Sequence, residues 1–163
     1  MTPPFIIEPL TARHNHEAFD CGEESLNDFL KRFARQNDEK DLGRTYVAVK
    51  SGEPYIYGYY TIASGAVRFD AIPDKLPRYP IPVAHLGRLA VDKAARGQKL
   101  GLALLADALR RAVTIADHLG IYAVEVYALT ENAREFYLKF GFTELLDDRL
   151  HLYLTIKKLR KLV

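Results

Sequence analysis

At residues 91–105 the chain contains the stretch Val91-Asp-Lys-Ala-Ala-Arg-Gly-Gln-Lys-Leu-Gly-Leu-Ala-Leu-Leu105. It reads as the end of an apolar strand over 83–91, a short loop over 96–101 and an amphipathic helix from about 102 to 118. The first amides of a helix have no intrahelical partner and carry the positive end of the helix dipole. Glycines at 97 and 101 let the backbone approach a ligand closely, and Arg96 and Lys99 add positive charge. The loop therefore predicts an anion site, although a plain strand-to-helix connection with chance glycines would use the same residues.

The segments around this loop predict alternating strands and helices. Upstream, the patterns predict a strand at 5–7, a helix from about 23 to 41 and strands at 45–49 and 55–67 that pair as a hairpin. Asp20 and Glu23 suit a capping box at the start of that helix. Downstream, they predict a strand at 122–127, a helix from about 130 to 141 and a strand at 150–156. This order predicts an α/β (α+β) fold, in which helices flank a mixed central sheet, as one domain over 1–163.

Composition narrows the class of protein. With 163 residues, 48% apolar and 27% charged, the chain suits one soluble domain and excludes disorder, collagen and coiled coil. A net charge of +2 is too small to argue for nucleic acid by itself. The single cysteine, Cys21, cannot form an internal disulfide, which favours a reducing compartment. The start of the chain has no signal-peptide pattern and no stretch suits a membrane span, so we expect a cytoplasmic protein without a membrane partner.

A second motif follows the strand at 122–127: Asn132-Ala-Arg-Glu-Phe-Tyr-Leu-Lys-Phe-Gly-Phe142. The loop at 96–101 has neither GxxxxGKS/T nor GxGxxG, which excludes a P-loop and a dinucleotide-binding fingerprint. Together, the two motifs resemble those of the GNAT superfamily of N-acetyltransferases, whose phosphate loop reads Arg/Gln-x-x-Gly-x-Gly/Ala. Arg96 and Gly101 match its ends, and Lys99 stands where the family has its middle glycine. The resemblance covers essentially the whole chain and implies a single GNAT-type domain whose sheet splays between the fourth and fifth strands.

The resemblance also implies roles for individual residues, with acetyl-CoA as cosubstrate and no metal. Pantetheine would bind along the splayed strand edge and the pyrophosphate on the loop amides. The implied cofactor-binding residues are Leu89, Ala90, Val91, Arg96, Gly97, Gln98, Lys99, Leu100, Gly101, Leu102, Asn132 and Phe136. Tyr137 matches the family's general acid, opposite the leaving sulfur. A phenol titrates near pH 10 and a thiol near 8.5, so full proton transfer is uphill by about 2 kcal/mol and a strong hydrogen bond is the better expectation. A plain core position for the Tyr137 ring is the alternative.

Four further strings point to a narrower group within the superfamily. They lie at 19–30, 58–61, 80–83 and 86–92, and they resemble the acetyltransferase toxins of type II toxin–antitoxin modules. This resemblance implies acetylation of the α-amino group of aminoacyl-tRNA, a small ribbon-helix-helix antitoxin as partner and a homodimer. Two alternatives stay open. The acceptor is a protein or small-molecule amine, or the chain is a non-catalytic CoA-binding module in which Lys99 has spoiled the loop.

No general base stands out in the sequence. The histidines at 85, 118 and 151 are scattered, and His14 and His16 have no third residue at metal-ligand spacing. An aminoacyl α-amine, with a pKa near 7.7 to 8.0, is partly neutral at cellular pH and has little need of a base. If tRNA is the acceptor, the first phosphate contacts to test are Arg110, Arg111 and the basic tail from Lys157 to Lys161, together with Arg32, Arg35 and Arg44.

Overall fold

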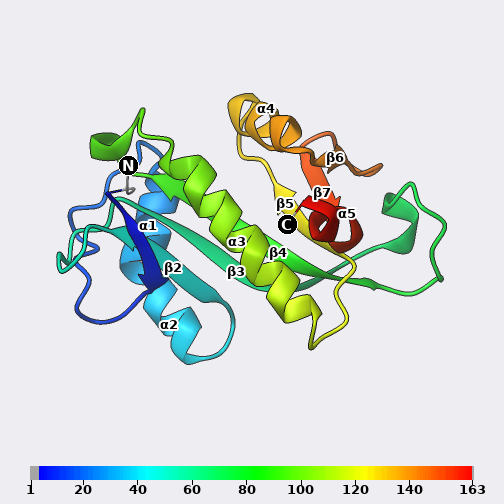
Figure 1. Cartoon of the computed structure of the whole chain (residues 1–163), viewed down its shortest axis with the longest axis horizontal. Coiled ribbons are helices and arrows are strands. Elements are labelled where there is room, and N and C mark those ends of the chain that lie inside the picture. The colour runs from blue at the N-terminus through cyan, green and yellow to red at the C-terminus, as the bar shows by residue number, and fades with distance from the viewer. Residues whose placement is uncertain (1–3, 163) are drawn as a thin grey trace. The chain divides into compact units, whose positions relative to one another are not determined.

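The computed structural model describes residues 4–162 (Figure 1). Twelve helices and strands, with short 3-10 turns at Phe69–Ala71 and Lys93–Ala95, make up this part of the chain. In order they are β1 (Ile6–Pro9), α1 (Glu24–Arg32), α2 (Ala34–Glu39), β2 (Arg44–Val49), β3 (Gly58–Val67), β4 (Ile81–Val91), α3 (Leu100–Ala116), β5 (Ala123–Tyr127), α4 (Glu131–Phe140), β6 (Thr143–Glu144), β7 (His151–Thr155) and α5 (Ile156–Leu162).

The strands form a mixed sheet in the order β1-β2-β3-β4-β5-β7-β6. β2 and β3 pair antiparallel, with Ala48 opposite Gly58, as the predicted hairpin requires. β4 and β5 pair parallel over three positions only, from Val83–Ala123 to His85–Glu125. The predicted mixed sheet with flanking helices is therefore confirmed, and the parallel ladder stops while both strands continue.

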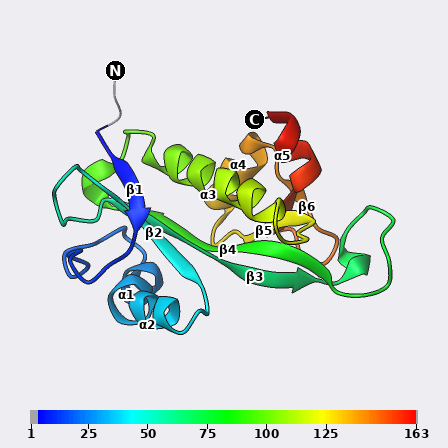
Figure 2. The same cartoon turned by 60° about the horizontal axis from the view of Figure 1, so that its bottom comes forward.

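By its internal contacts the chain divides into two compact units, and the prediction of a single domain stays a prediction. The first unit comprises Met1–Ala63 and Arg88–Ala108, and the second comprises Ser64–Gly87 and Leu109–Val163. In the first unit, neighbouring side chains of β3 point to opposite faces of the sheet. Tyr59 packs on α1, where its hydroxyl donates to the Leu26 carbonyl at 2.6 Å, whereas Gly58 faces the start of α3. Figure 2 shows α1 and α2 on one face of these strands and α3 on the other.

The second unit has its own apolar core. Val83 of β4, Ala123 of β5 and Tyr153 of β7 contribute inward-facing side chains, and residues of the 67–81 segment and Leu145 cover them. The segment between β3 and β4 has a short 3-10 turn at Phe69–Ala71 and is otherwise a loop. It is held to the sheet by a hydrogen bond from the Tyr122 hydroxyl to the Asp74 carboxylate.

Three details differ from the sequence prediction. The helix expected over 23–41 is two helices, because the backbone at Phe33 leaves helical geometry at φ −122° although the apolar periodicity continues. The expected capping box of Asp20 and Glu23 is wrong. Glu23 is itself the N-cap residue without a side-chain cap bond, and the Asp20 carboxylate accepts instead from Gly22 N–H and the Asn27 amide. β6 and α5 were not predicted, since a two-residue strand carries no periodicity and the basic tail resembles a solvated segment.

Candidate functional site

The predicted anion loop lies in the first unit, between β4 and α3. α3 begins at Leu100, two residues earlier than predicted, so residues 96–99 alone form the turn. The backbone N–H groups of residues 97–102 donate no hydrogen bond within the described range 4–162. Gly97 adopts φ +79° and has open space where a side chain would stand. Consecutive free amides at the start of a 17-residue helix form a concave donor surface of the kind that binds phosphate oxygens.

A buried aspartate anchors the start of this loop. Asp92 is 3% exposed, and its Oδ1 accepts from Ala94 N–H at 2.8 Å. Its Oδ2 accepts from Asp20 N–H at 3.0 Å and from the Tyr55 hydroxyl at 3.1 Å. One carboxylate thus joins the end of β4 to two other segments of the first unit.

Two loop side chains make contacts within the protein. The Arg96 guanidinium donates to the Cys21 carbonyl at 3.0 Å, and Gln98 Nε2 donates weakly to the Ala94 carbonyl at 3.4 Å. Lys99 is exposed, and its backbone lies in the left-handed region at φ +59°. This is the geometry for which the family motif keeps glycine, so the sequence departure at Lys99 preserves the loop conformation at the expense of strain.

We expect Lys99→Gly to stabilise the protein slightly. A left-handed backbone costs an L-residue about 1–2 kcal/mol, and the entropy of an added glycine returns about 0.5–1 kcal/mol of that. The free energy of unfolding, measured by urea titration, should therefore rise by roughly 0.5–1 kcal/mol. Lys99→Ala removes the same charge and keeps the strain, so it serves as the control. Equal stability of the glycine and alanine variants would contradict the strain argument.

The second motif lies in the second unit, on α4. The Thr130 hydroxyl caps this helix by accepting from Ala133 N–H at 3.1 Å, and Gly141 ends it at φ +112°. The ring of Tyr137 is buried between Phe136 and Phe142, at centroid distances of 5.2 and 5.3 Å.

Unlike its ring, the hydroxyl of Tyr137 is not enclosed by the protein. It has no hydrogen-bond partner within residues 4–162. Since every fully buried side-chain N or O atom in that range is paired, this hydroxyl must reach the molecular surface. Burial of the ring raises the pKa of Tyr137, which keeps the phenol protonated and able to donate.

The sequence-predicted site residues thus fall in two groups. Leu89, Ala90, Val91 and residues 96–102 belong to the first unit, where Ala90 and Leu100 are buried. Asn132, Phe136 and Tyr137 belong to the second unit, where Asn132 is exposed on the first turn of α4.

A chain of ionisable side chains in the second unit was missed by sequence reasoning. Glu125 of β5 accepts from Nδ1 of His85 at one oxygen and from Nε2 of His151 at the other, the latter at 2.6 Å. Nδ1 of His151 lies 3.0 Å from both oxygens of Asp147, and the ring of Tyr127 stacks on His151 at 3.9 Å. The available signal was Glu125 itself, a charge inside the otherwise apolar stretch Ala123–Val126.

The electrostatics of this chain favour two charged groups at its centre. Burial alone would raise the pKa of Glu125, but hydrogen bonds from His151 and His85 outweigh it and lower that pKa. Burial alone would lower the pKa of His151, but Glu125 and Asp147 outweigh it and raise that pKa. Both shifts favour the charged forms, a carboxylate at Glu125 and a protonated imidazole at His151.

No three or more His, Cys, Asp or Glu within residues 4–162 are grouped so that they could hold a metal ion. Over the same range, every helix is too short or too polar to cross a membrane.

Residues 41–144 match the acetyltransferase (GNAT) domain family, and the chain belongs to this family. It is 40% identical over 149 residues to a tRNA-acetylating toxin of Mycobacterium tuberculosis (strain ATCC 25618 / H37Rv), covering 90% of this chain and 89% of that protein.

Two solved structures are similar over nearly the whole chain. One is AtaT complexed with acetyl-methionyl-tRNAfMet, with a TM-score of 0.91, 32% identity and coverage of 97% of this chain and 98% of that one. The other is a tyrosine-to-phenylalanine mutant of the AtaT toxin bound to the C-terminus of the antitoxin AtaR and acetyl-CoA. Its TM-score is 0.86 at 31% identity, and the match covers 98% of each chain.

Proposed function

We propose that this protein is an acetyl-CoA-dependent N-acetyltransferase that acetylates the α-amino group of aminoacyl-tRNA and so acts as a translation-blocking toxin. The observation that carries the proposal is the 40% identity to a tRNA-acetylating toxin over 90% of the chain. The loop supports it independently, because residues 97–102 offer consecutive unpaired amides at a helix start, which suits the pyrophosphate of acetyl-CoA.

We assign the binding of acetyl-CoA to the residues that the family motifs imply. In the first unit, the backbone of Leu89, Ala90 and Val91 would bind pantetheine, and the amides of residues 97–102 would bind the pyrophosphate. Arg96 acts through the loop backbone, because its guanidinium is engaged by the Cys21 carbonyl. In the second unit, Asn132 and Phe136 would contact the pantetheine arm. Acetyl-CoA supplies the activated acetyl group as a thioester.

Tyr137 is assigned the role of hydrogen-bond donor to the leaving sulfur. Its phenol stays protonated because burial raises its pKa, and its hydroxyl has no partner within residues 4–162. A donor that is not engaged by the protein is available to stabilise the thiolate as charge develops on the sulfur.

The decisive experiment combines purified protein, acetyl-CoA labelled in the acetyl group and a mixed pool of charged tRNA. We expect label on the α-amine of aminoacyl-tRNA, and none on uncharged tRNA or on charged tRNA whose amine is already blocked. Label on a protein or small-molecule amine, with none on tRNA, would mean that this amine, and not aminoacyl-tRNA, is the acceptor. Tight acetyl-CoA binding without transfer to any amine would identify a non-catalytic module.

The remaining partners follow from the same proposal. We infer a small ribbon-helix-helix antitoxin as the neutralising partner, a homodimer as the working assembly, and the cytoplasm as the location, since charged tRNA is used there. Size-exclusion chromatography with light scattering, with and without the product of an adjacent small reading frame, tests the first two inferences.

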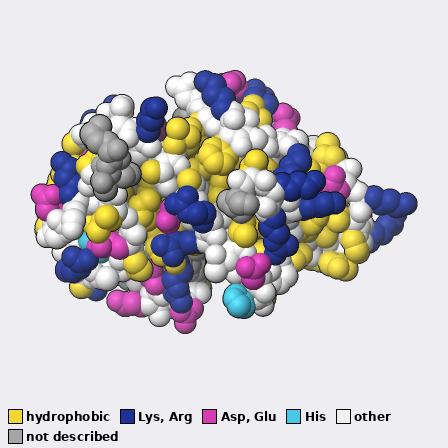
Figure 3. Space-filling model, viewed as in Figure 1, with side chains coloured by type: hydrophobic (Ala, Val, Ile, Leu, Met, Phe, Trp, Pro, Cys, Tyr) yellow, Lys and Arg dark blue, Asp and Glu magenta, His cyan; other side chains and the backbone are white. Residues whose placement is uncertain are grey.

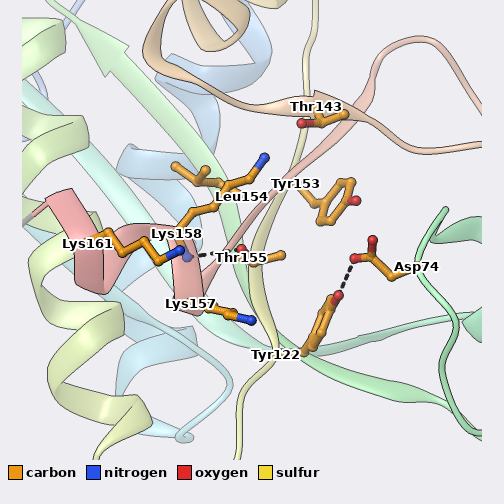
Figure 4. A pocket seen from close by; sticks show the side chains of 9 residues that line it. All are labelled: Asp74, Tyr122, Thr143, Tyr153, Leu154, Thr155, Lys157, Lys158 and Lys161. Carbon is orange, nitrogen blue, oxygen red and sulfur yellow. Dashed lines mark hydrogen bonds between the residues drawn. The ribbon is translucent and has the colours of Figure 1, made fainter.

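A lysine-lined pocket in the second unit is a suitable contact for tRNA phosphates. The pocket, of about 410 Å³, lies beside α5 and is lined by Lys157, Lys158 and Lys161, with the Tyr122–Asp74 pair at its far side (Figure 4). Within residues 4–162 none of the three lysines has an ion-pair partner. Lys and Arg side chains gather over α5 in the space-filling view (Figure 3). Unpaired ammonium groups around a hollow favour a polyanion.

Replacing Lys157, Lys158 and Lys161 together by Gln should weaken tRNA binding and reduce its salt dependence. Each phosphate contact contributes about 0.7–0.9 to the slope of log affinity against log salt concentration, so the slope should fall by roughly 2. Fluorescence anisotropy with labelled tRNA at several salt concentrations measures both effects. Lys31→Gln, Lys40→Gln and Lys139→Gln together remove the same charge elsewhere. An equal loss of slope in that control variant would mean that overall charge, not the pocket, determines binding.

A further inference from the structure

We propose that His85 accepts the proton that the acceptor amine loses during acetylation, and that Glu125 and His151 are positioning residues for it. The inference deepens the proposed function and rests on it, because it requires an amine acceptor and an acetyl donor. It is carried by the position of His85 in the sheet, by the hydrogen bonds behind it and by the pattern of exposure along the chain His85–Glu125–His151–Asp147.

His85 and Glu125 stand where the parallel ladder ends. They form the last of three paired positions between β4 and β5, although β5 continues for two residues and β4 for six. Beyond this pair the facing backbone edges of the two strands are free of each other. In the proposed function the acetyl donor binds along the free edge of β4, and that edge begins directly after His85.

The hydrogen bonds fix the protonation of the imidazoles. Because the Glu125 carboxylate can only accept, Nδ1 of His85 carries a hydrogen, so in the neutral imidazole Nε2 is the nitrogen with the lone pair. The other Glu125 oxygen accepts from His151, whose second nitrogen faces Asp147, so His151 is held as an imidazolium. When His85 is neutral, the formal charges of His85, Glu125, His151 and Asp147 sum to −1. A proton accepted by His85 brings this sum to zero. The network is therefore arranged to receive a proton at Nε2 of His85.

Exposure along the network is graded in the way this role requires. The side chains of Glu125 and His151 are 8% and 5% exposed, whereas those of His85 and Asp147 are 38% and 44% exposed. The middle is sealed and rigid, with the Tyr127 ring stacked on His151. The half-exposed imidazole at one end can reach an incoming amine and can pass its proton on to water afterwards.

The reaction balances with these groups. The neutral acceptor nitrogen forms a bond to the acetyl carbon, and its N–H proton moves to Nε2 of His85. The carbon–sulfur bond breaks, and the leaving thiolate accepts a hydrogen bond from the Tyr137 hydroxyl, which stays protonated, and then takes a proton from water. His85 returns its proton to water, so the net change is amine plus thioester to amide plus thiol.

The test distinguishes a proton acceptor at His85 from a purely structural residue whose hydrogen bonds only join β4, β5 and β7. His85→Asn keeps an N–H donor for Glu125 but has no basic nitrogen, and His85→Ala removes both. Steady-state acetylation of charged tRNA is measured from pH 6 to 8.5 for both variants and the wild type. His118→Asn, on an exposed histidine, is the matched control.

For the proposal, we expect His85→Asn to keep the wild-type melting temperature and the KM for acetyl-CoA. Its kcat at pH 7 should fall about 100-fold. The difference in kcat between the variant and the wild type should narrow as pH rises, because hydroxide then accepts the proton in place of His85. Added imidazole should raise the rate of His85→Ala. If His85→Asn keeps wild-type kcat, or loses it equally at every pH without rescue by imidazole in His85→Ala, the proposal is overturned. If the wild type itself transfers no label to charged tRNA, the proposed function fails instead, and the same pH series on the amine that it does acetylate tests His85.

Discussion

Tyr137→Phe is expected to lower the kcat of acetyl transfer by about 100- to 1,000-fold while leaving the KM for acetyl-CoA within about threefold of the wild type. The reason is that this change deletes only the hydroxyl. The ring, with its contacts to Phe136 and Phe142, is retained. A donor that acts on the leaving sulfur contributes in the transition state and little in the ground state, so its loss appears in kcat.

Tyr137→Phe should leave the stability of the folded state unchanged. Because the hydroxyl has no partner within residues 4–162, no hydrogen bond of the fold is broken and the melting temperature should not fall. Steady-state kinetics with charged tRNA and a thermal melt on the same preparation provide the measurement. Tyr79→Phe, at a 58% exposed tyrosine, is the control. A kcat reduced by less than threefold would mean that Tyr137 takes no part in the chemistry and serves only as a core residue.

The second large effect is expected on stability, from Asp92→Ala. This change leaves three donors without their acceptor, namely the backbone N–H groups of Asp20 and Ala94 and the hydroxyl of Tyr55. The three hydrogen bonds are part-buried, and a buried donor left unsatisfied costs about 1–3 kcal/mol, so the free energy of unfolding should fall by roughly 3–5 kcal/mol. Urea titration measures the loss directly.

Two further variants sharpen the prediction for Asp92. Asp92→Asn keeps one acceptor oxygen and should lose roughly half as much free energy of unfolding. Asp117→Ala breaks only the exposed pair with Arg160 and should lose less than about 1 kcal/mol. Since Asp92 fixes the start of the loop, Asp92→Asn should also raise the KM for acetyl-CoA. A loss below 1 kcal/mol in Asp92→Ala would mean that the three donors find water instead.

How far the sequence predicts this molecule depends on the range of the interactions involved. The loop and α4 were predicted nearly to the residue because their signals are local: glycines at positive φ, a threonine cap and a glycine stop. The break at Phe33 could not be predicted, because the apolar spacing runs through it without interruption.

The chain of His85, Glu125 and His151 could not be predicted for a different reason. His85 lies 40 positions before Glu125, and His151 lies 26 positions after it, so they meet only through the strand register. Arg88 illustrates the same limit. Its guanidinium lies 3.6 Å above the ring of Phe29 on α1, a contact that no local pattern around position 88 indicates.

Gly58 has a consequence for genetics. A Cβ at this position would stand 2.9 Å from a methyl of Leu104 and 3.1 Å from the Ala90 carbonyl, so even alanine would push α3 away from β3. The helix that would shift is the one whose first amides form the loop. If the protein arrests growth, a selection for surviving cells should therefore yield substitutions at position 58 as often as at Tyr137, although a glycine inside a strand has no chemistry of its own to lose.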